Sequence, residues 1–233
     1  MKLALFGAGA MGRLVSSRAK DDGHEVALIL TSRDGARSAE EVQQLLRGHD
    51  VAIDFSVSGA VLSNVNACML AGVPLVEGTT GWNDFKNQVR SVVEQHNGAL
   101  IYGANFSIGV NLFYRIVSRA AELFQRFPEY APFIEEAHHA RKRDAPSGTA
   151  LQLRELLQPV ASDIPVASTR AGYIPGTHRI GFDSAADQVI LTHTARTREG
   201  FAAGALLAAR WIVGRRGTYE FSEMIGEILK ESA

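Results

Sequence analysis

The chain has 233 residues, of which 46% are hydrophobic and 21% charged, a composition typical of a folded globular protein and not of a disordered or fibrous chain. Its 24 Lys and Arg residues nearly balance its 25 Asp and Glu residues, so no overall basic field is available to attract nucleic acid or anionic lipid. The single cysteine, Cys68, excludes an internal disulfide and fits a cytoplasmic location. No apolar run reaches the roughly 20 residues of a membrane span, so we expect no membrane association.

The first hundred residues alternate short apolar runs with helical patterns. Strands are predicted at residues 2–6, 24–30, 51–55, 74–77 and 99–102. Helices are predicted between them at residues 11–20, 40–46, 59–71 and 82–95. Such alternation is typical of a parallel sheet covered on both faces. We therefore expect residues 1–107 to form a doubly wound α/β domain.

The pattern changes after this domain. A helix is predicted at residues 110–127, a strand at 133–139 and a second helix at 147–157. Strands at 166–171, 178–182 and 188–195 then follow one another without helices, and residues 201–213 and 223–229 read as closing helices. Consecutive strands without crossovers favour a mixed or antiparallel sheet. We expect residues 108–199 to form a second, α+β domain, joined to the first near Ser107.

A glycine-rich turn follows the first predicted strand and opens the first predicted helix. The stretch GAGAMG carries the G-x-G-x-x-G spacing, which permits a tight turn, close backbone approach to a pyrophosphate and close packing of helix on strand. The helix N-terminus offers free N–H groups to the phosphates. Glycine-rich turns also occur for structural reasons alone, but the position favours a dinucleotide site of the Rossmann kind. The residues of the turn are Gly7, Ala8, Gly9, Ala10, Met11 and Gly12.

The end of the second strand bears on which dinucleotide is bound. NAD sites usually carry an acidic residue about 20 positions after the glycines, where it binds the ribose 2′-hydroxyl. Here the strand ends in Thr31, Ser32 and Arg33, with Asp34 next. Hydroxyls and a guanidinium suit a 2′-phosphate. NADPH is thus favoured, with NADH and an ordinary solvated loop as the alternatives.

Two further turns stand at predicted strand ends on the same edge of the sheet. They comprise Gly78, Thr79 and Thr80, and Gly103, Ala104, Asn105 and Phe106. Ligands of open α/β sheets collect outside the carboxyl ends of the strands, so both turns are candidates to line the cofactor. Either could instead be a turn with no binding role.

The densest chemistry lies in the stretch EEAHHARKRDAPSGTA, residues 135–150. Neighbouring strand residues face opposite ways, so His138 and His139 should have different roles. Histidine exchanges protons near neutrality, and Lys142 adds a charge and a second proton donor. Asp144 or Ser147 could cap the following helix. The N–H groups of Gly148 and Thr149 would then hold an anionic group.

Other interpretations of this stretch were weighed. A His-His pair could be half of a metal site, but the sequence offers no other His, Cys or acidic pair at ligand spacing, and we predict no metal. The basic run could contact nucleic acid, but it lacks interleaved aromatic residues and overall basicity.

Taken together, these motifs closely resemble bacterial dihydrodipicolinate reductase, also called 4-hydroxy-tetrahydrodipicolinate reductase, of the diaminopimelate route to lysine. The motifs are AHHARKRDAPSGTA, GAGAMG, IDFS, GTTGW, ANFSIGVNL and the tail HTARTREGFAAGALLAARWIVG. The resemblance implies hydride transfer from a nicotinamide cofactor to a small cyclic dicarboxylate, giving tetrahydrodipicolinate. It also implies that residues 200–233 return to the nucleotide domain.

The resemblance further implies a role for each matching residue. His138 would be the general acid/base, Lys142 a proton donor that offsets substrate charge, and His139, Gly148 and Thr149 the carboxylate ligands. The three glycine-containing turns would line the cofactor. A homo-oligomer, a tetramer joined through the second sheet, is implied as well.

The sequence departs from the family in two places. Ser32 and Arg33 stand where members that use NADH well often have an acidic residue. The segment 175–178 is shortened, which bears on the oligomer. Two rival functions stay open at this stage: a nucleotide-binding sensor without turnover, and a reductase acting on another imino acid.

Overall fold

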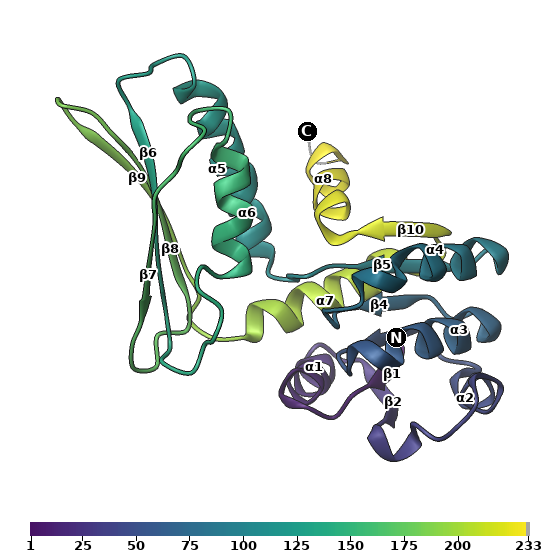
Figure 1. Ribbon diagram of the computed structural model, residues 1–233. Coiled ribbons are helices and arrows are strands. Elements are labelled where there is room, and N and C mark those ends of the chain that lie inside the picture. The colour runs from purple at the N-terminus through teal and green to yellow at the C-terminus, as the bar shows by residue number, and fades with distance from the viewer. Residues whose placement is uncertain (232–233) are drawn as a thin grey trace. The chain divides into compact units, whose positions relative to one another are not determined.

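The short apolar runs of the N-terminal half pair into one parallel sheet. The computed structural model describes residues 1–231, which divide into unit 1 (residues 1–108 and 198–231) and unit 2 (residues 109–197). The sheet of unit 1 has parallel neighbours throughout (Figure 1). Its strands, in spatial order, are β10 (Gly217–Glu220), β5 (Ala99–Tyr102), β4 (Leu75–Glu77), β3 (Val51–Asp54), β1 (Lys2–Phe6) and β2 (Glu25–Leu30).

Helices cover both faces of this sheet. They are α1 (Ala10–Asp21), α2 (Ala39–Leu46), α3 (Val61–Ala71), α4 (Lys86–Gln95), α7 (Glu199–Ile212) and α8 (Phe221–Glu231), with short 3-10 turns at Ser32–Asp34, Ser58–Ala60 and Asn83–Phe85. Apolar residues of α2, α3 and α4 form one core with β1, β3, β4 and β5. Helix α7 packs on β3, β4 and β5 and against α1. This is the doubly wound, Rossmann-like arrangement predicted from the sequence, and the fold class is confirmed.

The strand order places a topological switch point beside the glycine-rich turn. Strand β1 has β2 on one side and β3 on the other, so the chain leaves β1 in one direction and returns on its opposite flank. Ligands of open α/β sheets bind outside the carboxyl ends of strands at such a point. The ends that meet here are Phe6 of β1 and Asp54 of β3, which are paired in register.

Unit 2 consists of a four-stranded mixed sheet with two helices on one face (Figure 1). In spatial order the strands are β7 (Val166–Arg170), β6 (Ala131–His138), β8 (Thr177–Asp183) and β9 (Gln188–Thr194). Strands β6 and β7 are parallel, and the other two pairs are antiparallel. The helices are α5 (Ile108–Phe124) and α6 (Gly148–Leu157).

The core of unit 2 lies between the helices and the sheet. It joins Phe113 and Val117 of α5 to Leu153 of α6 and to Ile180 of β8. Alternate residues of β6 are buried, which leaves the intervening residues on the face away from the helices. The α+β architecture with a mixed sheet is as predicted.

The structure corrects the sequence prediction in three elements. Strand β10 was not predicted, because Gly217–Glu220 is a half-buried edge strand without an apolar run. Helix α4 begins at Lys86 and not at Trp82, since Asn83–Phe85 form a 3-10 turn first. Helix α5 begins two residues earlier than predicted and ends at Phe124. Within residues 1–231 no helix has the length and apolar character that crossing a membrane requires.

Candidate functional site

The three glycines of the first turn each meet a different physical demand. Gly7 has φ +97°, and a Cβ there would lie 2.5 Å from the carbonyl oxygen of Phe55. A Cβ on Gly12 would lie 1.9 Å from the carbonyl oxygen of Gly7, so only glycine lets α1 pack this closely. Beside Gly9, in contrast, a Cβ would meet no atom within 4 Å. The turn is therefore tight at its two ends and open at its centre.

The open centre of the turn is also the N-terminus of a helix. Gly9 is the N-cap of α1, no side chain caps the helix, and its first turn holds no acidic residue. The first N–H groups of such a helix lack intrahelical partners and carry a partial positive charge. Ala8, Gly9 and Ala10 are exposed, so these groups face free space. The residues fit the diphosphate of a dinucleotide.

In the loop after β2 two residues are exposed, and the acidic residue is engaged in local hydrogen bonds. Oδ2 of Asp34 accepts hydrogen bonds from the backbone N–H of Thr31 at 2.9 Å and from its hydroxyl at 3.1 Å, while Oδ1 pairs with Arg37 at 3.2 Å. The Thr31 N–H bond is the main reason why the pKa of Asp34 is lowered. Ser32 and Arg33 are exposed. The carboxylate is thus engaged locally.

A pair of buried carboxyl groups underlies the turn after β4. Asp54 and Glu77 are both 0% exposed and are neighbours in register. Burial raises the pKa of Glu77 well above its usual value, and the charge of Asp54 raises it further. Burial also raises the pKa of Asp54. Both carboxyl groups are therefore harder to ionise here than in water.

This pair determines what the neighbouring threonine does. The Thr79 hydroxyl lies 3.3 Å from Asp54 Oδ1 and accepts the Ser56 N–H at 3.1 Å, and the Thr79 N–H donates to Glu77 Oε1 at 2.7 Å. The Thr79 side chain is buried and engaged, whereas Thr80 is exposed. Of the two predicted threonines, Thr80 presents its side chain to solvent.

The turn after β5 combines core and surface residues. Phe106 is 1% exposed and packs its ring against Phe221 at 4.7 Å. Its carbonyl oxygen lies 1.8 Å from where a Cβ of Gly204 would stand, so α7 passes directly over this turn. Gly103 and Asn105 are half-buried and Ala104 is exposed. Phe106 therefore shapes the turn from beneath.

Sequence reasoning missed one residue that touches these turns. The carbonyl of Phe55 fills the space beside Gly7, its ring fills the space beside Gly78, and that ring lies 6.1 Å from the ring of Phe106. The available signal was its position directly after β3, at the switch point. Phe55 is the residue around which the glycine-containing turns assemble.

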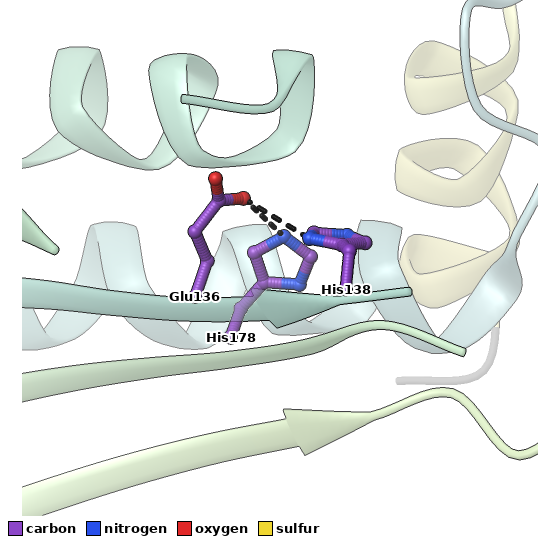
Figure 2. A group of neighbouring side chains, drawn as sticks. All are labelled: Glu136, His138 and His178. Carbon is purple, nitrogen blue, oxygen red and sulfur yellow. Dashed lines mark ion pairs between the residues drawn. The ribbon is translucent and has the colours of Figure 1, made fainter. Parts of the chain in front are cut away.

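In unit 2 the predicted general acid/base lies in a buried polar cluster. His138, at the end of β6, is 7% exposed. Its Nδ1 lies 3.4 Å from Oε2 of Glu136, and Nε2 of His178 lies 3.7 Å from the same oxygen. Figure 2 shows both imidazoles directed at this one carboxylate oxygen. The cross-strand register explains the cluster, because Glu136 of β6 lies opposite His178 of β8.

The second oxygen of Glu136 is held by three donors. Oε1 accepts from the Ser147 N–H at 3.0 Å, the Ser168 hydroxyl at 2.7 Å and the Arg170 guanidinium at 2.7 Å. Burial by itself raises the pKa of Glu136, but these hydrogen bonds outweigh burial and lower the pKa to about 2. The carboxylate is therefore ionised and fixed in place at neutral pH.

The two buried histidines are neutral at the same pH. Burial lowers the pKa of His178 to about 4, and the neighbouring His138 lowers it further. Burial also lowers the pKa of His138; the charges of Lys142 and Arg170 add to this effect, whereas Glu136 and Asp144 oppose it. His138 is thus a neutral imidazole surrounded by charged groups of both signs.

The loop after β6 carries the remaining predicted residues. Lys142 Nζ lies 2.8 Å from Oδ1 of Asp144, and the Gly148 N–H also binds Asp144. Hydrogen bonding by Lys142 is the main cause of the lowered pKa of Asp144. The loop is anchored by Arg170, whose guanidinium donates to the Asp144 carbonyl. The Lys142 ammonium and the N-terminus of α6 thus bind the same anion, the Asp144 carboxylate.

The first turn of α6 forms as the predicted anion site requires. Ser147, and not Asp144, is the N-cap, and its hydroxyl accepts from the Ala150 N–H at 3.2 Å. Gly148 is exposed, and a Cβ there would meet nothing within 4 Å. The Thr149 side chain bonds that of Tyr114. His139 follows the end of β6, half-buried, so it differs from His138 in its surroundings.

Sequence reasoning predicted no metal, yet three residues of metal-binding types converge here. Glu136, His138 and His178 offer atoms that lie within 4.8 Å of one another. The positive charge that a divalent ion would supply is already provided by Arg170, 2.7 Å from the same carboxylate. A second cation in this buried space would meet strong repulsion. Among residues 1–231 we therefore interpret the cluster as a hydrogen-bonded network.

The structure places some of the predicted site residues near one another and adds neighbours that were not predicted. Unit 2 brings His138 and Lys142 to one end of β6, with Gly148 at the adjacent helix N-terminus. Glu136, Arg170 and His178 were not predicted. Only Glu136 had a signal in the sequence: it lies two residues before His138 on β6, so both face the helices.

Comparison with known proteins places the chain in a family. Residues 1–106 match the N-terminal part of dihydrodipicolinate reductase, and residues 109–225 match its C-terminal part. A 4-hydroxy-tetrahydrodipicolinate reductase of Christiangramia forsetii is 33% identical over 99% of this chain and 100% of its own length. One of Archaeoglobus fulgidus is also 33% identical, over 97% and 100%.

A solved structure shares the fold. The dipicolinate-bound dihydrodipicolinate reductase of Paenisporosarcina sp. TG-14 superposes with a TM-score of 0.78 at 20% identity, covering 94% of this chain and 97% of its own. The resemblance read from the sequence motifs is confirmed, and the chain belongs to the dihydrodipicolinate reductase family.

Proposed function

We propose that the chain is a 4-hydroxy-tetrahydrodipicolinate reductase. It reduces a small cyclic dicarboxylate to tetrahydrodipicolinate with hydride from a nicotinamide nucleotide, a step of lysine synthesis through diaminopimelate. Family membership over the whole chain supports the reaction type. The observation that carries the proposal is one continuous segment in which Lys142 and the N-terminus of α6 bind a single anion, Asp144. His138 stands at the start of this segment, at the end of β6.

The dinucleotide is held by the first turn of unit 1. When bound, the nicotinamide supplies the hydride. The α1 N-terminus binds the diphosphate, with the open space at Gly9 admitting it. Thr80 and Ala104, both exposed at neighbouring strand ends, line the same edge of the sheet.

The substrate is held by unit 2. A ring with two carboxylates needs two anion sites, and the loop after β6 offers the Lys142 ammonium and the N–H groups of Gly148 and Thr149. His139, one residue beyond the strand, is the second candidate carboxylate ligand. A cationic pocket also stabilises the negative charge that develops as hydride adds to the ring.

The proton that completes the reduction comes from the same loop. Hydride adds to carbon 4 of the conjugated C=C–C=N system, and a proton must then reach carbon 3. Lys142 is the donor. The neutral imidazole of His138 then takes up a proton from solvent and passes it to the Lys142 amine. Each turnover therefore consumes one hydride and one solvent proton, and both side chains end as they began.

We further propose that NADPH is preferred over NADH. Asp34 is engaged with Thr31 and Arg37 and does not compete for a ribose hydroxyl. Exposed Ser32 and Arg33 are left to bind a 2′-phosphate, which a guanidinium holds in bidentate fashion.

A homo-oligomer is part of the proposal. Helices α5 and α6 cover one face of the unit 2 sheet (Figure 1). The other face carries the ion pair between Glu135 and Arg179, flanked on β6 by Phe133 and Ala137. We propose that copies of the chain associate through this face. Light scattering during size-exclusion chromatography tests it, and a monomer at micromolar concentration contradicts it.

A coupled assay tests the proposed reaction. Purified protein should oxidise NADPH only when a dihydrodipicolinate synthase generates the substrate in the cuvette. Oxidation with simple 2-oxo acids and ammonia, and none in the coupled assay, would assign the chain to another imino acid. Nucleotide binding without any turnover would identify a sensor.

A further inference from the structure

Two buried polar atoms of unit 2, on Glu136 and His138, lack a hydrogen-bond partner and lie close to each other. Oε2 of Glu136 and Nδ1 of His138 are both buried, and neither makes a hydrogen bond to another group within the described structure. They lie 3.4 Å apart, and Figure 2 shows the imidazole edge turned toward the carboxylate. A buried polar atom without a partner costs roughly 1–3 kcal/mol. The two atoms satisfy each other if a proton lies between them.

The carboxylate dictates on which side that proton lies. The donors on Oε1 keep Glu136 ionised, and an ionised carboxylate accepts hydrogen bonds only. Nδ1 of His138 must then carry the hydrogen, and Nε2 carries the lone pair. The Nε2 edge lies beside Gly176, where a Cβ would stand 3.2 Å from Nε2. Because no side chain is present at Gly176, the basic nitrogen is not obstructed from that direction.

The same carboxylate connects the imidazole to the anion site. Through Oε1 it holds the N–H of Ser147, the N-cap of α6, and the Arg170 guanidinium, which anchors the Asp144 carbonyl. A shift of the carboxylate would therefore move His138 and the substrate-binding helix terminus together.

We propose that Glu136 is the positioning residue of this active site: it fixes His138 in the Nδ1–H tautomer, directs the basic Nε2 outward for proton transfer, and sets the first turn of α6 in register with it. This inference rests on the proposed function for its kinetic consequence, but the tautomer itself does not depend on turnover. His178, against the same oxygen and 3.2 Å from the Ser147 hydroxyl, supports the carboxylate from β8.

The structure predicts a specific effect of Glu136→Gln. Three donors hold Oε1, so the amide oxygen of glutamine occupies that position and the NH2 group occupies the position of Oε2. The amide then donates to Nδ1 of His138, and the proton of the imidazole moves to Nε2. The wrong nitrogen is protonated for base catalysis, although size and packing are conserved.

Two measurements test the proposal. Nitrogen-15 NMR of histidine-labelled protein at pH 7.5 should show the Nδ1–H tautomer for His138 in the wild type and the Nε2–H tautomer in E136Q. In the coupled assay E136Q should lower kcat roughly 10²- to 10⁴-fold, the usual weight of a general acid–base group, with a smaller change in KM. Glu136→Asp, which keeps the carboxylate, should recover part of the loss.

Glu122→Gln is the matched control. Glu122 is an exposed carboxylate on α5 in an ion pair with Arg119, and its loss should leave kcat and the His138 tautomer unchanged. The proposal is wrong if wild-type His138 is the Nε2–H tautomer, or if E136Q turns over like the wild type. If E136Q does not fold, the tautomer of His138 in the wild type and the kcat of E136D still test the proposal. An inactive wild type would instead refute the proposed function.

Discussion

The ammonium of Lys142 lies 2.8 Å from the carboxylate of Asp144, which also receives the Gly148 N–H at the start of α6. The Lys142 ammonium and the Gly148 N–H are the groups proposed to hold a substrate carboxylate. Asp144 is more than half exposed, so it can leave without a large desolvation change. The side chain therefore occupies the anion site as an internal competitor.

Removing this competitor should tighten substrate binding. An exposed ion pair contributes about 0.2–1 kcal/mol, so Asp144→Asn should lower KM for the ring substrate by a factor of about 1.4 to 5. Lys142→Ala should instead raise KM and lower kcat, because both charge and proton donor are lost. Steady-state kinetics of the two variants separate these outcomes. A raised KM in D144N would show that Asp144 orients Lys142 and does not compete.

His138→Ala should affect turnover far more than binding. The imidazole handles protons and, as a neutral group, contributes little to holding a dianion, so kcat should fall roughly 10²- to 10³-fold while KM changes little. His96→Ala serves as control, since His96 is exposed at the end of α4. Equal kcat values for H138A and the wild type would show that His138 is not the general acid/base.

Gly9 and Gly12 should respond oppositely to alanine. A Cβ at Gly12 would stand 1.9 Å from a backbone oxygen, so Gly12→Ala should lower the free energy of unfolding by about 3 kcal/mol. Gly9→Ala has free space and a compatible φ of −69°, so it should leave stability unchanged or raise it by up to about 1 kcal/mol. The added methyl should nevertheless weaken nucleotide binding about tenfold, about 1.4 kcal/mol. Chemical denaturation measures the effect on stability, and calorimetric titration measures the effect on binding. If G9A bound the nucleotide as tightly as the wild type, the diphosphate would not bind at this turn.

Arg33→Ala should discriminate between the two cofactors. Loss of a charge-assisted contact to a 2′-phosphate should raise KM for NADPH by about tenfold or more, with little change for NADH. Arg119→Ala, an exposed arginine of α5 paired with Glu122, should alter neither. Parallel titrations with both nucleotides check this, and equal effects of R33A on the two would argue against the 2′-phosphate contact.

Glu77 should make the protein less stable as pH rises. Its pKa is raised in the folded chain, by burial first and by Asp54 second, so folding takes up a proton above the unfolded pKa of about 4.3. The free energy of unfolding then falls with increasing pH, by up to about 1.4 kcal/mol per unit, until the folded pKa is passed. Urea unfolding at pH 5 and pH 8 should show this fall in the wild type and a smaller one in Glu77→Gln.

The control for Glu77 is Glu94→Gln, a substitution on the exposed surface of α4. It should keep the wild-type difference between the two pH values. An identical difference in E77Q and the wild type would mean that Glu77 is ionised in the folded protein.

Local sequence patterns predicted elements whose formation depends on short-range physics. The continuous apolar runs of β1, β3 and β5 predicted buried parallel strands, and the GAGAMG spacing predicted a turn whose glycines at positions 7 and 12 are sterically required. The Ser147 cap was one of two alternatives. Family motifs, not periodicity, predicted the return of the C-terminal segment. Within that segment α7 packs on the sheet, and β10 joins the sheet edge although it has no apolar signature.

The missed site residues depend on register and not on local pattern. His178 and Arg170 join the cluster because β8 places His178 opposite Glu136 and β7 places Arg170 opposite His138. Cross-strand pairing of this kind joins residues 32 and 42 positions apart, and composition does not encode it. Of the missed residues, only Glu136 could have been predicted from the sequence, because it lies two positions before His138 on the same face of a strand.

The passage of α7 over the turn after β5, with Gly204 against the carbonyl of Phe106, has a consequence for biogenesis. One continuous stretch of the chain forms unit 2. The sheet and helix layers of unit 1, in contrast, are complete only when the segment from Arg198 onward has joined them. On the ribosome the inserted unit is fully synthesised while its host still lacks two helices and an edge strand. The nucleotide-binding half is therefore the last to mature, although its first strand is the first to emerge.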